Sequence, residues 1–206
     1  MSKNKYINLI YKDLIMCKKP FIYYLLFSII IPLLLPIEIL NEYFLVPAVM
    51  ILGYLLCLIN VIVIYQDEKS MGTCLLVTTP YSRKSIVVSR YLLCGFAALL
   101  CMFFYFGIDF LVTGKLHFVS FTGIIMFFIL CLFISTMLPV SFKFKPTIAS
   151  SIILLIIFTP TMLFAEFLRT ENVKSLSISV GMTLISILLI MLSINISLRI
   201  YSKKDL

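Results

Sequence analysis

Apolar residues fall in six long runs along this chain, separated by short segments that carry most of the charged residues. A helix rises about 1.5 Å per residue, so about 20 residues cross the roughly 30 Å hydrocarbon core of a bilayer. Each run has about that length, and the pattern therefore predicts an all-α polytopic membrane protein with one membrane domain over residues 1–206. The predicted transmembrane helices are residues 21–37, 44–64, 91–113, 118–140, 147–168 and 177–198.

Composition supports this interpretation. The chain is 62% hydrophobic and 13% charged, whereas a soluble domain is about 45–50% apolar and about 25% charged. This excludes an ordinary soluble enzyme, and it excludes a disordered chain because disordered segments are poor in apolar side chains. The first apolar run follows a polar segment and has no small-x-small cleavage site, so we expect it to be retained as a span.

The basic residues predict the orientation of the chain in the membrane. Fourteen of the 17 lysines and arginines lie in segments 1–20, 65–90, 141–146 and 199–206, which six spans place on one side. The positive-inside rule then makes both termini cytoplasmic. The same distribution explains the net charge of +8 through contacts with anionic lipid headgroups. We therefore expect membrane lipids, and no nucleic acid, as partners.

No cofactor or metal is expected in this chain. The six cysteines lie in predicted spans or cytoplasmic segments without a CxxC pair, so we expect them to pack and not to form a disulfide framework. The phosphate-binding pattern G-x-x-x-x-G-K-[ST] is absent from the sequence. His117 stands alone in an outer loop, without a second residue to form a catalytic site. We therefore expect no enzyme activity in the chain itself.

Residues 1–20 predict an amphipathic helix that lies in the membrane interface. Ile7, Ile10, Tyr11 and Leu14 recur at spacings of three and four, with lysines between them. We expect Pro20 to end this helix before the first span, because proline breaks a continuing helix. The alternative is a short basic flank that only sets the topology.

The segment 65–90 could do work in the cytoplasm. Asp67 and Glu68 stand where a short helix could begin, because acidic residues favour a helix N-terminus. Thr79-Pro80 would end that helix, and Ser82 can cap a new helix that continues into the third span. Such a projection, joined rigidly to two spans, could transmit a push from a docked partner. The alternative is a solvated loop that obeys the positive-inside rule.

Arg83 and Lys84 fall in the first turn of that new helix. Positive charge is unfavourable there by roughly 0.3–1 kcal/mol, because the N-terminus of a helix is itself positive. Something other than local helix stability must therefore favour these two residues. Lipid phosphates and an acidic surface on a partner protein are the two candidates.

Three polar or helix-breaking residues in the spans are candidates for a gate or a substrate path. Asp109 and Glu166 lie near the predicted outer ends of the third and fifth spans, where they could favour release of a cationic peptide. Acids are also tolerated at headgroup depth without any function. Pro160, between two threonines, interrupts the fifth span and could form either a gate or a passive kink.

Other polar residues within the spans are expected to face neighbouring helices, where small or polar side chains help packing. Some of them could line a pore instead. They are Asn60, Ser135, Thr136, Asn195 and the pair Ser150–Ser151.

Segment 65–90 resembles the corresponding loop of small six-span permeases of type-2 ATP-binding cassette exporters. The similarity extends to the Lys12-Asp13-Leu14 start and to the basic tail over residues 199–206, although Thr79 departs from the apolar residue expected before the proline. The elements that carry it are Asp67-Glu68, Leu75-Leu76, Pro80-Tyr81-Ser82-Arg83, Ile86-Val87 and Arg90.

The resemblance implies a permease subunit that works with a separate cytoplasmic ATPase, which would bind ATP and Mg. A second copy of this chain or a homologous permease, together with two ATPase subunits, would complete the assembly. The loop after the second span would then be the coupling helix. The residues implied in ATPase coupling are Asp67, Glu68, Leu75, Leu76, Pro80, Ser82, Arg83 and Lys84.

The family resembled includes phenol-soluble modulin exporters of Gram-positive bacteria and lantibiotic immunity permeases. This implies that the substrate is an amphipathic antimicrobial or cytolytic peptide, exported across the plasma membrane. One alternative is a membrane scaffold or immunity protein that sequesters a peptide or partner without transport. A second is an ATP-independent channel, which would conduct as a purified chain.

Overall fold

The computed structural model describes residues 4–34, 42–69, 82–113, 121–144, 148 and 176–203. The regular elements within these ranges are all helices, and the predicted all-α fold class is confirmed. They are α1 (Asn4–Met16), α2 (Lys18–Leu34), α3 (Glu42–Lys69), α5 (Arg83–Thr113), α6 (Phe121–Lys143) and α8 (Leu176–Ser202). Most of the fifth predicted span, 147–168, lies outside the described residues.

Among the described residues, three helices are long and apolar enough to cross a membrane: Arg83–Ile108 of α5, Gly123–Lys143 of α6 and Gly181–Ser202 of α8. The pair α1 and α2 passes the same test together, but it is bent by 82° and counts as one broken candidate span. Within α3, Ile51–Tyr65 is a shorter apolar helix. The described residues therefore support up to four of the six predicted spans by length and composition.

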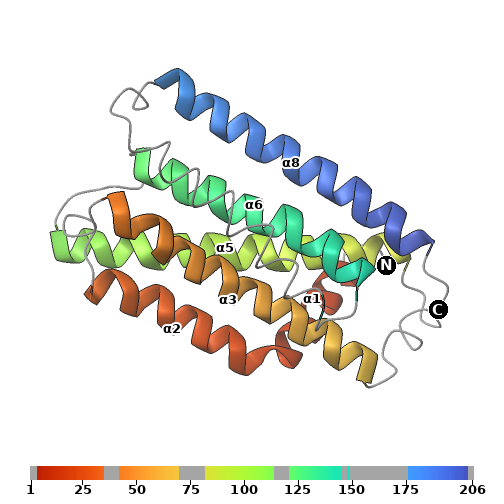
Figure 1. The fold of residues 1–206 in the computed structure, drawn as a ribbon. Coiled ribbons are helices and arrows are strands. Elements are labelled where there is room, and N and C mark those ends of the chain that lie inside the picture. Colours follow the sequence, from red (N-terminus) through yellow and green to blue (C-terminus); the bar gives the residue numbers. More distant parts are fainter. Residues whose placement is uncertain are drawn as a thin grey trace.

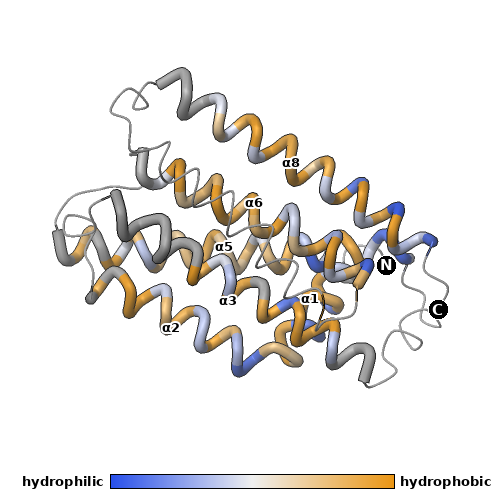
Figure 2. The backbone as a smooth tube through the Cα atoms, in the orientation of Figure 1, coloured by the Kyte–Doolittle hydropathy of each residue, from blue (hydrophilic) through white to orange (hydrophobic). Residues whose placement is uncertain are grey.

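The long helices run alongside one another, and α1 lies across one end of the bundle (Figure 1). At that end α5 begins, and α3, α6 and α8 end. Figure 2 shows that hydrophilic residues gather there, while the helices are apolar along most of their length. We call this the basic end, defined by the described residues Lys12, Lys18, Lys19, Arg83, Lys84, Arg90, Lys143, Arg199 and Lys203.

The hydrophobic core forms around α5 and α6. The α6 helix packs against α3 on one side and α8 on the other, while α5 packs against α1, α2 and α8. In the candidate spans, 61% of the α6 segment is buried but only 22% of the α8 segment. The α8 helix is therefore peripheral, and most of its apolar surface is left for lipid or for another chain.

A glycine on α3 allows a side chain of α6 to pack directly against the α3 backbone. A Cβ atom added to Gly53 would lie 2.6 Å from Cδ2 of Phe133, which is closer than real Cβ atoms come to their neighbours. Glycine is therefore required at this position for the Phe133 ring to lie against the α3 backbone. Leu52 and Leu56 on the same helix are fully buried beside this contact.

The predicted N-terminal helix is present, but it ends before Pro20. The chain turns at Cys17, where the Cys17 N–H donates to the Asp13 carbonyl at 3.0 Å and the Phe21 N–H donates to the Cys17 carbonyl at 2.8 Å. The prediction that Pro20 ends the helix was therefore wrong by three residues. Pro20 lies in the first turn of α2, where a missing N–H leaves no helical hydrogen bond unmade.

The α1 helix has two distinct faces. Ile7 and Tyr11, from the predicted apolar face, are exposed and available to a membrane surface. Leu9, Asp13 and Cys17 form a second face that is buried against the bundle. The spacing of three and four indicated the first face, but the second depends on contacts with distant helices, and its acidic member was not expected to be buried. Placement of α1 in the membrane interface stays a prediction.

Candidate coupling region

The predicted coupling segment begins differently from expectation. Asp67 and Glu68 belong to the last turn of α3, which continues through Lys69, and not to the start of a new helix. The prediction failed because neither proline nor glycine stands between Gly53 and Gly72 to stop α3. The side chains of Asp67 and Glu68 lie outside the described residues. So do the predicted coupling residues Leu75, Leu76 and Pro80.

Ser82 caps α5 as predicted. Its hydroxyl oxygen accepts a hydrogen bond from the Ser85 N–H at 3.2 Å, and its carbonyl accepts from the Ser85 hydroxyl at 2.7 Å. The carbonyl also accepts from the N–H groups of Ser85 and Ile86, at 2.9 and 3.3 Å. These bonds satisfy donors at the N-terminus of α5 that have no partner within the helix. The end of the coupling segment is thereby fixed to the helix.

Arg83 contacts the far end of the chain. Its Nη1 donates a hydrogen bond of 2.7 Å to the carbonyl of Ser202, the last residue of α8. The C-terminus of a helix carries unpaired carbonyls and partial negative charge, so an arginine is favourable there. This contact explains why a cation stands in the first turn of α5. Neither candidate weighed from the sequence, lipid phosphate or partner acid, included the end of α8.

Polar groups in the last turn of α8 form hydrogen bonds both within α8 and with α5. The Ser202 hydroxyl donates to the Arg199 carbonyl at 3.0 Å, while the Ser202 carbonyl accepts from Arg83. The Lys203 N–H closes a tighter turn onto the Ile200 carbonyl at 3.3 Å. Arg83 and its neighbour Lys84 are both exposed. The two basic residues of the predicted coupling set are therefore distinguished by the Arg83–Ser202 hydrogen bond and not by burial.

A chain of hydroxyl groups joins three helices deeper in the bundle. The Ser193 hydroxyl of α8 donates to the Ser135 carbonyl of α6 at 2.6 Å. Because its proton is used there, Ser193 accepts from the Tyr91 hydroxyl of α5 at 2.5 Å. Tyr91 in turn accepts from the Ser197 hydroxyl of α8 at 2.8 Å. The Ser135 carbonyl can only accept, so it fixes which group donates and which accepts in each hydrogen bond of this series.

Pro139 explains why the Ser135 carbonyl is available. Proline has no N–H, so within α6 it leaves the carbonyl four residues earlier without its helical donor. That carbonyl belongs to Ser135, and Ser193 supplies the missing hydrogen bond. The sequence contained this signal, because a proline inside an apolar helical run leaves the carbonyl four positions before it without its donor. Its partner on α8 could not be read from the sequence.

Aromatic contacts surround a second arginine near the basic end. Arg90 is 4% exposed, and its guanidinium carbon lies 5.7 Å from the centre of the Phe142 ring of α6. Phe142 also meets Tyr201 of α8 edge to face, with ring centres 5.4 Å apart. Stacking of a cation on an aromatic face offsets part of the loss of water around the charge.

Buried charge also anchors α1. Asp13 is 2% exposed, and Lys12 Nζ lies 3.2 Å from its Oδ1. Asp13 and Arg90 both lie close enough to Cys94 to act electrostatically on its thiol. Burial raises the pKa of the Cys17 thiol to about 11, and the Asp13 carboxylate adds to this rise. The N-terminal helix therefore meets α5 at a site that holds charges of both signs.

The structure confirms some of the contacts predicted for polar residues within the spans and contradicts others. Asn60 is buried, and its Nδ2 donates to the Cys94 Sγ of α5 at 2.9 Å, so this prediction is confirmed. The hydroxyls of Ser135 and Thr136 both donate back to the Leu132 carbonyl of their own helix, at 3.0 and 2.8 Å. Asn195 is exposed on α8, so the prediction that it faces a neighbouring helix is wrong within the described residues. Ser150–Ser151 lies outside them.

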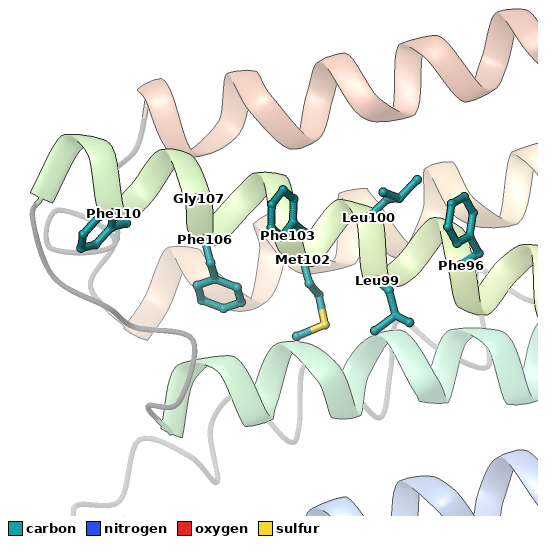
Figure 3. A pocket seen from close by; sticks show the side chains of 8 residues that line it. All are labelled: Phe96, Leu99, Leu100, Met102, Phe103, Phe106, Gly107 and Phe110. Atoms are coloured by element: carbon teal, nitrogen blue, oxygen red, sulfur yellow. The ribbon is translucent and has the colours of Figure 1, made fainter.

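An apolar groove of about 600 Å³ runs along α5, away from the basic end. Figure 3 shows the lining that the described residues contribute, which comes from α5 and includes four phenylalanines. Phe103 is 70% exposed and Leu99 60% exposed within it. The lining residues are Phe96, Leu99, Leu100, Met102, Phe103, Phe106, Gly107 and Phe110.

The structure describes little of the predicted gate. Asp109 belongs to α5 and directly precedes Phe110 of the groove, but the structure does not describe its side chain. Pro160 and Glu166 lie outside them entirely. Within the described part of the chain, no group of three His, Cys, Asp or Glu residues could hold a metal ion.

Comparison with known protein families matches residues 8–202 to a family described as ABC-2 family transporter protein. The matched range contains α2, α3, α5, α6 and α8 in full, with most of α1. Neither a curated protein nor a solved structure matches the chain.

Proposed function

We propose that this chain, which belongs to the ABC-2 transporter family and is a permease subunit of that type, exports an amphipathic peptide using a separate ATPase subunit. ATP and Mg²⁺ would bind to that subunit. Two permeases, either two copies of this chain or this chain and a homologue, would pair with two ATPase subunits in the plasma membrane. The proposed substrate is an antimicrobial or cytolytic peptide.

The observation that carries the proposal is the attachment of the α5 N-terminus. Ser82 fixes the end of the segment to α5, and Arg83 fixes α5 to the end of α8. A force applied at Ser82 would therefore act on α5 and, through Arg83, on α8. This arrangement is what a permease driven by an external ATPase requires.

The charge distribution supports a cytoplasmic position for this region. All lysines and arginines among the described residues lie in the helices or turns that form the basic end, where Figure 2 shows hydrophilic residues gathered. By the positive-inside rule the basic end would face the cytoplasm, where an ATPase subunit can reach it. Both termini would then be cytoplasmic.

The groove on α5 supports an apolar substrate surface. Its lining is formed by large apolar side chains, which suit the apolar side of an amphipathic helix better than a sugar or an ion. Asp109 follows in the same helix, toward the end opposite the basic end. Outward movement along this helix would bring a cationic peptide from an apolar surface to an acidic one.

Co-purification of an ATPase with the tagged chain tests the proposal. Lys84→Gln should reduce the recovered ATPase by roughly two- to fivefold, because an exposed ion pair is worth about 0.2–1 kcal/mol. Arg83→Glu combined with Lys84→Glu should abolish recovery while membrane insertion stays intact. Lys19→Gln is the matched control, because Lys19 is an exposed lysine at the start of α2. It should leave recovery unchanged.

Undiminished recovery with the double charge reversal would contradict docking at this site. Absence of any co-purifying ATPase from native membranes would favour the non-transporting scaffold or immunity protein. Conductance by the purified chain alone would favour the channel.

A further inference from the structure

We propose that α5 carries α8 with it when the coupling segment moves, through a latch formed by Arg83, Tyr91, Ser193, Ser197 and the Ser202 carbonyl. Arg83 and Tyr91 act here as positioning residues. The inference rests on the proposed function, because it names the path by which ATPase docking would reach a peripheral helix.

The first step is that α8 packs chiefly against α6 and less extensively against α5. Only 22% of its candidate span is buried, and Leu184, Leu188 and Leu192 are each more than half exposed. Its inward side carries buried serines, among them Ser193 and Ser197, together with partly buried apolar residues that pack against the core. In a membrane, apolar surface gains nothing by leaving lipid, so close packing and hydrogen bonds hold such a helix.

The second step is that the latch has two points. Arg83 bonds the last residue of α8, and Tyr91 bonds Ser193 and Ser197 further along it. Arg83 and Tyr91 are eight residues apart, which is about 12 Å along α5. One contact would be a pivot about which α8 could swing. Two contacts at this separation fix its direction relative to α5.

The third step is that the deeper point has few alternatives. Tyr91 and Ser193 each both donate and accept a hydrogen bond, Ser197 donates to Tyr91, and the series ends on a carbonyl that Pro139 leaves without a helical donor. In hydrocarbon no water is available to replace a broken member. The contact should therefore hold or break as a unit, and it should also hold α6 to α8.

The fourth step places the latch beside the coupling segment. Arg83 follows Ser82 directly, and Ser82 receives the end of that segment. A displacement at Ser82 moves Arg83 first, then the last turn of α8, and then the deeper contact at Tyr91. Lys84, the neighbouring basic residue, is exposed like Arg83. Arg83 therefore lies at both the docking site and the latch, whereas Lys84 is assigned to docking.

Hydrogen exchange on the purified full-length chain tests the latch without any partner. Arg83→Gln should speed amide exchange in residues 199–203 by about tenfold, because a hydrogen bond from a charged donor is lost. Lys84→Gln makes the same charge change next door and should leave that exchange unchanged. Arg83→Lys retains a donor and should restore part of the protection. Equal exchange in the Arg83→Gln and Lys84→Gln variants would overturn the latch.

The hydroxyl of Tyr91 provides a second comparison. Tyr91→Phe keeps the ring and removes the two hydrogen bonds to α8, so exchange around residues 193–197 should rise. Tyr23→Phe removes a hydroxyl from an exposed tyrosine of α2 and should have no effect on α8. No difference between these two variants would also overturn the latch.

Transmission is tested on the complex with the ATPase that co-purifies with the wild-type chain. Adenylyl imidodiphosphate with Mg²⁺ should change exchange in α8 of the wild-type complex. The double variant Tyr91→Phe with Ser193→Ala changes no residue of the proposed docking set, so it should still bind the ATPase but lose that change. A nucleotide effect on α8 that persists in this variant, or that is missing from the wild type, overturns transmission. Failure of any ATPase to co-purify overturns the proposed function instead.

Discussion

The α3–α6 contact and the α5–α8 contact hold helices together by different means. Gly53 lets the Phe133 ring lie on the α3 backbone, so that contact depends on shape. Tyr91, Ser193 and the Arg83–Ser202 pair make the other contact through hydrogen bonds. The first contact depends on the fit of one ring against a backbone, whereas the second depends on a small number of polar groups. The comparison therefore indicates that different kinds of substitution should break the two contacts.

The largest effect is expected from breaking the shape-dependent contact. Gly53→Ala places a Cβ 2.6 Å from the Phe133 ring and should destabilise the chain by about 1–3 kcal/mol, as overpacking does in cores. The loss of stability is measured by thermal unfolding in detergent, monitored by circular dichroism because the sequence contains no tryptophan. Gly95→Ala is the matched control, because a Cβ there meets nothing within 4 Å.

Gly95→Ala should leave the chain unchanged or stabilise it by about 0.5–1 kcal/mol, since alanine favours a helix over glycine. If the two substitutions act equally, the contact between Gly53 and Phe133 is not tight. Phe133→Leu in the Gly53→Ala background should recover part of the loss.

A smaller effect is expected from the hydrogen-bonded contact. Ser193→Ala removes the donor to the Ser135 carbonyl, and the loss should be about 1 kcal/mol, because hydrogen bonds between membrane helices average about 0.6 kcal/mol. Ser186→Ala is the control on the same helix: Ser186 is equally buried, and its hydroxyl donates to the Met182 carbonyl of α8 itself. An equal loss from both serines would show that the bond between helices adds nothing.

The smallest effect concerns the α1 helix, whose contact with the bundle includes buried charge. With its pKa near 11, Cys17 holds only about a thousandth of its thiol as thiolate at pH 8, and the thiolate is the reactive form. Its alkylation, followed by mass spectrometry of the peptide, should be slow and should rise about tenfold per pH unit up to pH 11. Lys84→Cys supplies an exposed thiol for comparison.

Asp13→Asn should speed alkylation of Cys17 at a given pH, because it removes a negative charge that raises this pKa. The change should be modest, since burial is the larger cause of the rise. Alkylation of Cys17 as fast as that of the introduced Lys84→Cys thiol would contradict the buried position of the α1 contact.

Sequence reasoning succeeded where the cause was local. The cap at Ser82 follows from a serine before a helical segment, and apolar runs of span length mark α5, α6 and α8. It also placed Asn60 correctly, because an amide inside an apolar run needs a partner. These features depend on residues within a few positions of one another, or on the cost of an unpaired polar group.

Sequence reasoning failed where the cause was a distant helix. The partner of Arg83 is 119 positions away, and no pattern near Arg83 indicates it. The bend at Cys17 and the burial of Asp13 depend on how α1 meets α5. The exposure of Asn195 likewise depends on which side of α8 faces α6, and several sides of that helix are equally apolar.

Pro139 has a consequence for how the protein is made. The ribosome completes α6 before it synthesises α8, so the Ser135 carbonyl enters the bilayer without its eventual donor. An unpaired carbonyl in hydrocarbon is unfavourable by several kcal/mol. Until Ser193 arrives, newly made α6 should therefore stay near the insertion machinery or a water-filled site, and release of the two helices into lipid should be a single late event of biogenesis.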